Sequence, residues 1–335
     1  MTPPADHPAI PPAKVGVLIV NLGTPDAAEA GAVRRYLAEF LSDPRVIEIP
    51  RLIWKPILHG VILRTRPRKS AHAYSLVWRE DGSPLAAITA EQAAALRARF
   101  GDAVMVEHAM RYGRPAIAET IAAMKAAGCE RILIAPLYPQ YCAATTATAN
   151  DAAFAALAMM RWQPAIRTLP PYHDDPAYIG ALKANIEASL AALPFEPDAI
   201  VASFHGMPAR TLALGDPYHC HCQKTARLLA EALGRDLTVS FQSRFGRAKW
   251  LGPATDVTLA GLPAKGAKRV AVVAPGFSAD CLETLEEIAI RGRETFLDAG
   301  GTDFAYLPCL NAGQDGIEML HLLLRRELAG WTEAS

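Results

Sequence analysis

The sequence predicts an α/β protein of two similar lobes, each a mostly parallel, Rossmann-like sheet flanked by helices. The chain has 335 residues, which at about 150 residues per domain suits two domains or one large α/β unit. Six short apolar runs, typical of strands buried on both faces, alternate with alanine-rich helical patterns. Such alternation is typical of doubly wound sheets. The expected strands cover residues 15–20, 104–107, 131–135, 199–204, 237–242 and 269–274.

The first expected strand, Val15 to Val20, is an unbroken apolar run that ends in the turn NLGTPD. A helical pattern follows from about Ala27 to Phe40, so the chain begins with a βα unit. Further helical patterns cover residues 90–100 and 115–127. The later strands run into the loops HAMRYG, PLYPQY, HGMP, SRFG and PGFS. Because ligands of such folds bind beyond the carboxyl ends of the strands, we expect the chemistry in these loops.

Two pairs of similar segments indicate that the two halves of the chain share one plan. VLIVNLGTP and IVASFHGMP are apolar strands that end in a Gly-x-Pro turn. RILIAPLYP and RVAVVAPGF are strands that begin with arginine and end in proline with an aromatic residue. Each half carries one of each, in the same order. The predicted lobes are 14–168 and 169–330, with the boundary at the segment LPPY that begins at Leu169.

The composition excludes several classes of protein. Lysine plus arginine and aspartate plus glutamate both total 34, so the net charge gives no general attraction to nucleic acid. Six cysteines without a CxxC pair exclude a disulfide scaffold, and reduced thiols are the expectation. Residues 1–13 are proline-rich and lack the apolar segment of a signal peptide. No apolar run approaches the ~18 residues of a membrane span.

His205 is the first candidate for chemistry. It follows the apolar run 200–204 and precedes Gly206, so its imidazole lies at the carboxyl end of a strand, beside an open turn. A histidine there can transfer protons near neutral pH or bind a metal. A structural histidine bonded to a neighbouring carbonyl explains the position equally well.

The acidic segment 280–297 is the second candidate. On an α-helix, Asp280, Glu283 and Glu287 lie on one face, at spacings i, i+3 and i+7. Three carboxylates on one face suit a cation or a proton path. Acids in the first turn of a helix also complement its dipole, and the pattern taken alone favours that structural reading.

Aromatic residues gather at the same strand ends and in one loop-prone segment. Several aromatic rings that converge on one site suit a flat apolar ligand, although each ring by itself suits the core. They are Tyr138, Tyr141, Phe245, Trp250 and Phe277, with Tyr74 and Trp78 in the loop-prone segment.

An apolar segment with basic flanks lies at 51–69, and we call it the lip. Its centre, LIWKPILHGVIL, is too short to span a bilayer. A tryptophan-bearing apolar segment among arginines and lysines favours contact with an anionic lipid surface. The alternative is a buried helix with a solvated basic connector.

The run His219-Cys220-His221-Cys222 is dense in soft metal ligands. It could supply part of a zinc or iron–sulfur site, but four adjacent side chains cannot all reach one ion. Distant ligands would be needed, and a surface loop without metal is the simpler reading.

Seven motifs, in this order, resemble the protoporphyrin ferrochelatase family over about residues 14–327. Each motif alone is weak, but seven in register are highly specific. They are VLIVNLGTP, LYPQY, SFHGMP, GDPYHC, FQSRFG, WLGPATD and FSADCLETLEEI.

The resemblance implies a porphyrin cleft between the two lobes and insertion of ferrous iron into protoporphyrin IX, the terminal step that forms protohaem. His205 and Glu283 match the family's histidine and glutamate, implied both as catalytic groups and as contacts of the Fe²⁺ substrate, and Glu287 is expected to assist them. The positions expected to face the porphyrin or its propionates are Arg66, Tyr74, Ser83, Arg111, Tyr138, Trp250 and Phe277.

These residue types suit the reaction. Metal insertion removes two pyrrole N–H protons and strips water from the iron. A neutral His205 can accept a proton, and imidazole and carboxylate are suitable ligands for Fe²⁺. Whether His205 mainly binds iron or mainly takes the proton stays open at this point.

Some members of the family carry a [2Fe-2S] cluster. For this chain the resemblance allows a cluster with Cys142, Cys220 and Cys222 among its ligands, and no other cofactor is expected. Fe²⁺ itself is a substrate.

The implied partners are protoporphyrin IX, ferrous iron and a membrane surface, with no nucleic acid. The chain is expected to be a monomer or homodimer in the cytoplasm, peripheral on the cytoplasmic face of the membrane. The alternatives are another tetrapyrrole chelatase, acting on coproporphyrin or with cobalt, and a non-catalytic porphyrin or haem carrier.

Overall fold

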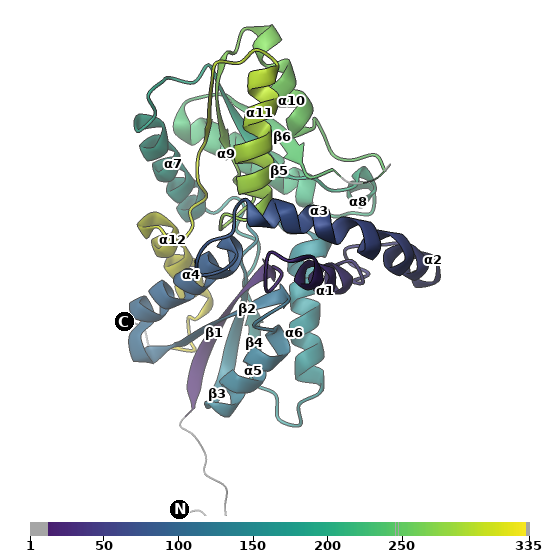
Figure 1. Ribbon diagram of the computed structural model, residues 1–335. Coiled ribbons are helices and arrows are strands. Elements are labelled where there is room, and N and C mark those ends of the chain that lie inside the picture. The colour runs from purple at the N-terminus through teal and green to yellow at the C-terminus, as the bar shows by residue number, and fades with distance from the viewer. Residues whose placement is uncertain (1–12, 245, 247, 333–335) are drawn as a thin grey trace, which may run out of the picture.

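The computed structural model describes residues 13–244, 246 and 248–332, and Figure 1 shows two lobes stacked one above the other. Each lobe holds a four-stranded parallel sheet, with strand order β2-β1-β3-β4 in the first and β6-β5-β7-β8 in the second. The two-lobed α/β prediction is therefore confirmed. The strands of the first sheet are β1 (Lys14–Gly23), β2 (Met105–Tyr112), β3 (Cys129–Pro136) and β4 (Ala165–Thr168). Those of the second are β5 (Ala199–His205), β6 (Leu237–Gln242), β7 (Arg269–Val273) and β8 (Asp303–Tyr306).

The two lobes repeat one plan, as the paired motifs predict. β1 and β5 carry the Gly-x-Pro motifs and hold the same place in their sheets, while β3 and β7 carry the other pair. The turns after β1 and β5 also share a steric constraint. A Cβ on Gly23 would lie 1.7 Å from the carbonyl oxygen of Tyr112, and one on Gly206 would lie 2.4 Å from that of Gln242. Only glycine lets these turns press against the neighbouring strand.

Helices cover the sheets of both lobes and connect their strands. Ser83 caps α4 by accepting from the N–H of Ala86, and Asp175 caps α7 by accepting from that of Ala177; a proline follows each cap. The first-lobe helices are α1 (Ala30–Phe40), α2 (Arg51–Ile57), α3 (Leu63–Ser75), α4 (Pro84–Phe100), α5 (Ile117–Ala126) and α6 (Thr148–Ala158). They are followed by α7 (Pro176–Ala191), α8 (Ala209–Ala213), α9 (Tyr218–Leu233), α10 (Thr255–Gly261), α11 (Arg293–Asp298) and α12 (Gln314–Glu327). Wider π-helical turns span Leu58–Ile62, Ala143–Ala147 and Glu283–Gly292, and 3₁₀ turns span Gly101–Ala103 and Pro263–Lys265.

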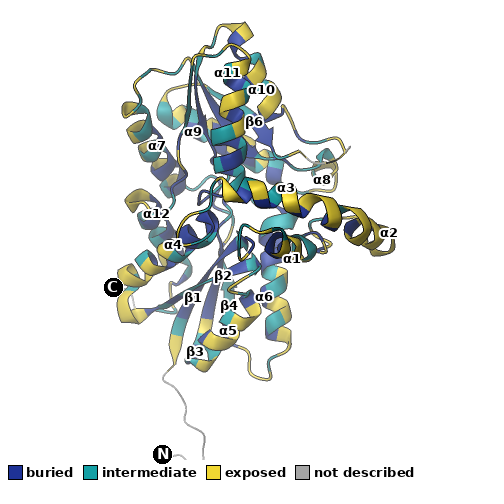
Figure 2. Ribbon diagram, in the orientation of Figure 1, coloured by how far each residue is buried: buried dark blue, intermediate teal, exposed yellow. Residues whose placement is uncertain are grey.

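One apolar core runs through both lobes. Its largest cluster joins residues of β1, β3 and α4 to residues of β5, α7, α9 and α12, and Figure 2 shows the buried residues along both sheets. The last helix, α12, packs on α7 and α4. Arg167 of β4 secures the chain after this helix, donating to the carbonyl of Ala329 at 2.9 Å, while its guanidinium lies 4.3 Å from the centre of the Trp331 ring. The segment after β8 thus ties the two lobes together.

The predicted lip forms α2, a π-helical turn and α3, which Figure 1 shows crossing between the lobes and projecting to one side. The tryptophan of the lip was expected to contact a lipid surface, and this expectation was wrong. Trp54 is buried against Leu58 and Leu63, and its indole N–H donates to the carbonyl of Leu41 at 2.6 Å. Other apolar side chains are exposed instead, led by Leu52 at 91% and Ile53 at 59%.

Two expectations fall on residues without a described structure, namely the proline-rich start at residues 1–12 and the aromatic Phe245. Within the described part of the chain, no helix combines the length and the apolar character needed to cross a membrane.

Candidate active site at the lobe interface

His205 is the last residue of β5, at the carboxyl end of the second sheet, and it is half-buried. Its backbone carbonyl accepts a hydrogen bond of 3.0 Å from the hydroxyl of Tyr218. Its ring lies edge-on to Phe277, with the ring centres 6.3 Å apart. Trp250 lies beside the next residue, because a Cβ on Gly206 would be 3.4 Å from its ring. The structure therefore places Phe277 beside His205, and Trp250 beside Gly206.

Glu283 and Glu287 lie on the π-helix Glu283–Gly292, and loops of the second sheet hold both. The side-chain amide of Gln242, which pairs with His205 in the β5–β6 register, donates to the carbonyl of Glu283 at 2.9 Å. The carboxylate of Glu287 accepts from the backbone N–H of Ser243 at 2.7 Å and from its hydroxyl at 2.6 Å. π-helical turns are frequent at functional sites, and this one sets Glu283 beside the strand end that carries His205.

The Glu283 carboxylate lies close enough to tyrosines of the first lobe to raise the pKa of their phenols. Tyr74 of α3 is buried, and burial followed by the nearby Glu283 carboxylate raises the pKa of its phenol. Burial likewise raises the pKa of Tyr36, with smaller contributions from Tyr74 and Glu283. Leu282 packs in the same cluster as Tyr74. The site thus spans both lobes. Tyr36 was not among the predicted residues, because α1 carries no motif that marks it.

Asp280 does not share a face with Glu283 and Glu287, so the predicted three-carboxylate face is wrong. It precedes the π-helix and is buried. Its carboxylate accepts from the hydroxyls of Thr284 at 2.9 Å and Tyr306 at 2.5 Å. The side-chain amide of Asn311 donates to it at 2.7 Å. These bonds make Asp280 part of the protein interior.

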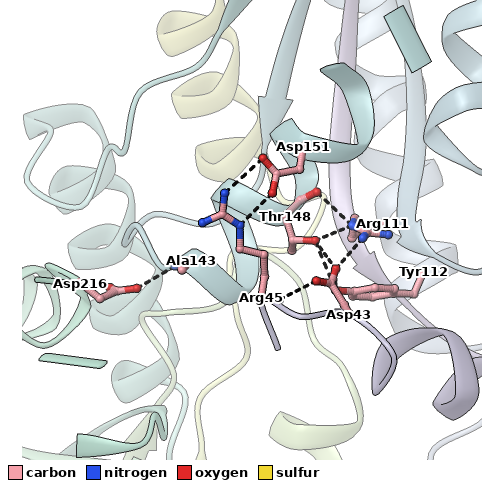
Figure 3. A network of polar contacts seen from close by, with 8 residues as sticks. All are labelled: Asp43, Arg45, Arg111, Tyr112, Ala143, Thr148, Asp151 and Asp216. Carbon is pink, nitrogen blue, oxygen red and sulfur yellow. Dashed lines mark hydrogen bonds and ion pairs between the residues drawn. The ribbon is translucent and has the colours of Figure 1, made fainter. Parts of the chain in front are cut away.

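Arg111 of β2 is held in a buried polar network, drawn in Figure 3. Its guanidinium donates to the carboxylate of Asp43 at 2.5 Å, and to the hydroxyl and carbonyl of Thr148 at 2.7 and 3.0 Å. Asp43 also accepts from Tyr112 at 2.8 Å. Burial and the neighbouring Tyr112 raise the pKa of Tyr138, whose buried hydroxyl has no hydrogen-bond partner among the described residues. Arg111 is therefore fixed by Asp43 and Thr148, and Tyr138 is enclosed within the first lobe.

Two further predicted residues lie on the elements that flank the site. Ser83 is buried, and its hydroxyl accepts from the N–H of Ala86 at 3.2 Å, which places it as the cap of α4. Arg66 is exposed on α3, about two turns before Tyr74. Arg66 is the more exposed of these two residues, and partial burial of its guanidinium lowers the pKa of that group.

The cysteines considered as cluster ligands lie in different surroundings. Cys220 is exposed and Cys222 is buried on the same helix, α9. Burial raises the pKa of both Cys142 and Cys222, and Cys142 raises that of Cys222 further, so these two thiols are neighbours. In the described part of the chain, no three His, Cys, Asp or Glu side chains are grouped so that they could hold a metal ion. The cluster stays a prediction.

A small hollow of about 260 Å³ opens at the carboxyl ends of β1 and β2. Thr24, Tyr36 and Arg114 are among the residues that line it. It shares Tyr36 with the tyrosines around Glu283, but neither His205 nor Glu283 lines it. The hollow therefore borders the site on the first-lobe side.

Comparison with solved structures supports the fold. SirB from Bacillus subtilis with Fe³⁺ gives a TM-score of 0.59 at 14% identity, over 95% of this chain and 97% of that one. DR2241 from Deinococcus radiodurans, a multi-domain protein with structural similarity to chelatases, gives 0.53 at 12% identity, over 93% of this chain and 55% of that one. At such identities the likeness concerns the fold alone.

The sequence comparisons are much closer. The chain is 57% identical over 333 residues to the ferrochelatase of Rhizobium meliloti (strain 1021), covering 97% of this chain and 98% of the relative. It is 53% identical over 328 residues to that of Azoarcus sp. (strain BH72), covering 96% and 90%. The family model described as Ferrochelatase matches residues 14–328. With this match over nearly the whole chain, and with relatives of this identity, the chain belongs to the ferrochelatase family.

Proposed function

We propose that this chain inserts ferrous iron into protoporphyrin IX and so forms protohaem. The observation that carries the proposal is the link through Gln242, which pairs with His205 in the sheet and bonds to the backbone of Glu283. An imidazole and a carboxylate thus lie on adjoining elements at one strand end. Family membership and the ferrochelatase relatives support the same activity.

The reaction needs a base for the pyrrole protons and oxygen or nitrogen ligands for the entering Fe²⁺. His205 accepts a proton from the macrocycle, or binds the iron, through its half-buried ring. Glu283 attracts the cation, and Glu287, tied to Ser243, extends the negative charge along the π-helix. Iron is the substrate here, and the proposal needs no resident cofactor.

The aromatic side chains suit a flat, apolar ring. Phe277 and Trp250 stand beside His205 in the second lobe, and Tyr74 faces Glu283 from the first. Apolar and aromatic surfaces with a few charged groups are typical of sites for such ligands. Arg66 on α3 is the residue that we assign to a porphyrin propionate, because a guanidinium can bind a carboxylate with two hydrogen bonds.

The lip supports peripheral contact with the cytoplasmic face of a membrane. Leu52, Ile53 and Val61 expose apolar side chains on α2 and the turn after it, and Figure 2 shows this arm as largely exposed. Basic side chains surround them, which suits anionic lipid. The exposed lysines and arginines of the lip are Arg51, Lys55, Arg64, Arg66, Arg68 and Lys69. Protoporphyrin, an apolar substrate, would reach the site from such a surface.

The test is anaerobic turnover of the purified chain with Fe²⁺ and protoporphyrin IX, followed by the absorbance of protohaem. Coproporphyrin with Fe²⁺, and protoporphyrin with Co²⁺, run in parallel to separate the chelatase alternatives. His205→Ala should lower kcat at least about hundredfold, a barrier increase of about 2.7 kcal/mol. Porphyrin binding without turnover by the wild type would favour the carrier alternative instead.

Two further measurements complete this test. Light scattering distinguishes the monomer from the homodimer. Iron and acid-labile sulfide per chain, measured after anaerobic purification of the wild type and Cys222→Ser, test for the cluster. Sulfide near zero in the wild type would remove the cluster from consideration.

A further inference from the structure

The segment that leads into the π-helix is held by one buried residue. Asp280 lies three residues before Glu283, and its carboxylate accepts from the side chains of Thr284, Tyr306 and Asn311. Asn311 also accepts from the backbone N–H of Asp280 at 2.8 Å, through its side-chain oxygen. Its own backbone N–H donates to the carbonyl of Ser278 at 3.2 Å. The start of the π-helix is thus fixed to the loop before α12.

Gln92 attaches this assembly to the first lobe. It lies on α4 and is 1% exposed. Its side-chain amide donates to the carbonyl of Ser278 at 3.1 Å and to that of Asn311 at 2.9 Å. Both acceptors belong to the second lobe, and they stand on the two segments that Asp280 joins.

The same face of α4 supports the segment with apolar contacts. Leu85, Ile88 and Gln92 are spaced i, i+3 and i+7, so they lie on one face of the helix. Leu85 and Ile88 pack in one cluster with Ala279 and Cys281. Apolar contact alone allows sliding, whereas two hydrogen bonds from one amide fix position and direction.

We propose that Gln92, with Asn311 and Asp280, forms a clamp that positions Glu283 for metal insertion. Gln92 is a positioning residue in this scheme, because it touches the backbone that carries Glu283 and not the reacting atoms. The inference rests on the proposed function, since it concerns how Glu283 takes part in that reaction.

Loss of the Gln92 amide should therefore act on catalysis through Glu283. Gln92→Leu keeps the apolar volume but removes the side-chain donor from both carbonyls, so the Ser278 carbonyl keeps only the bond from the backbone N–H of Asn311. The segment 278–283 then relaxes, and the Glu283 carboxylate leaves its working position. We expect kcat to fall about tenfold, a barrier change of about 1.4 kcal/mol, while KM for protoporphyrin changes less than twofold.

A double-mutant cycle separates positioning from a general structural role. In the Glu283→Gln background the same Gln92→Leu change should lower kcat by less than about twofold, because the group that it positions is already disabled. The matched control is Thr89→Val on the same helix, which loses the bond from Asn21 within the first lobe. It should leave kcat unchanged.

A second variant covers the case in which Gln92→Leu does not fold. Asn311 has a φ of +51°, which glycine adopts freely, so Asn311→Gly keeps the backbone and its carbonyl while removing the bonds to Asp280. Like Gln92→Leu, Asn311→Gly should lower kcat in the otherwise wild-type chain and have a much smaller effect on kcat in the Glu283→Gln background.

Two results would overturn the inference. The first is a wild-type kcat in both Gln92→Leu and Asn311→Gly. The second is an equal fold-loss of kcat in the wild-type and Glu283→Gln backgrounds. Both results require that the wild-type chain forms protohaem. A wild type that forms no protohaem would refute the proposed function instead.

Discussion

Asp43 is the centre of the polar network that holds Arg111, and its replacement by alanine should lower the free energy of unfolding by about 3–5 kcal/mol. The carboxylate is buried and accepts from Arg111 at 2.5 Å, Tyr112 at 2.8 Å, Thr148 at 2.5 Å and the backbone N–H of Arg45 at 2.7 Å. Its removal leaves the Arg111 guanidinium, 19% exposed, without its counter-charge. Arg111 keeps its bonds to Thr148, so the loss stays near the cost of breaking one buried pair.

The pH dependence gives an independent check on Asp43. Burial alone would raise the pKa of its carboxyl, but the bonds from Thr148, Arg45 and Tyr112 and the charge of Arg111 outweigh burial and lower the pKa below the usual 3.8. The network therefore contributes full stability above pH 3.8, and this contribution is lost as the pH falls through the lower folded-state value.

The assay is urea denaturation of the wild type, Asp43→Ala and Asp43→Asn, followed by circular dichroism. Asparagine keeps the shape and part of the hydrogen bonding but not the charge, so it should lose less stability than alanine. A loss below about 1 kcal/mol for Asp43→Ala, the range of an exposed ion pair, would refute this account of the network.

Three further predictions concern the site, the lip and a histidine pair. Glu283→Gln should lower kcat at least about hundredfold and Glu287→Gln about tenfold, measured as protohaem formation; equal, mild effects would instead support the helix-dipole reading. Leu52→Ser should weaken sedimentation with anionic vesicles while the equally exposed Met159→Ser does not, and retention of both variants on vesicles would exclude the lip. Burial, with the stacked His221 at 3.6 Å, lowers the pKa of His173 from 6.5 to about 4. The folded state thus favours the neutral ring, and stability should fall between pH 6.5 and 4 by on the order of 3 kcal/mol. His173→Gln should flatten that part of the urea-denaturation profile, and an unchanged slope would contradict the assignment.

The predicted strands owe their recognition to burial on both faces. The first strand reads as one apolar run because helices cover both sides of its sheet, and a run of this kind is visible without any partner. β4 and β8 were missed for the converse reason. Each has only four residues, none of them buried, so no apolar run is required.

The sequence alone determined the family, the parallel sheets and the position of His205 at a strand end, because each is encoded in contiguous residues. Only the tertiary structure decided which charged and aromatic groups meet. Asp280 was expected beside Glu283, but its partners Tyr306 and Asn311 lie 26 and 31 residues away and turn it inward. Gln92 contacts Asn311 across 219 residues. Local periodicity carries no information about such contacts, since they depend on how two lobes fold against each other.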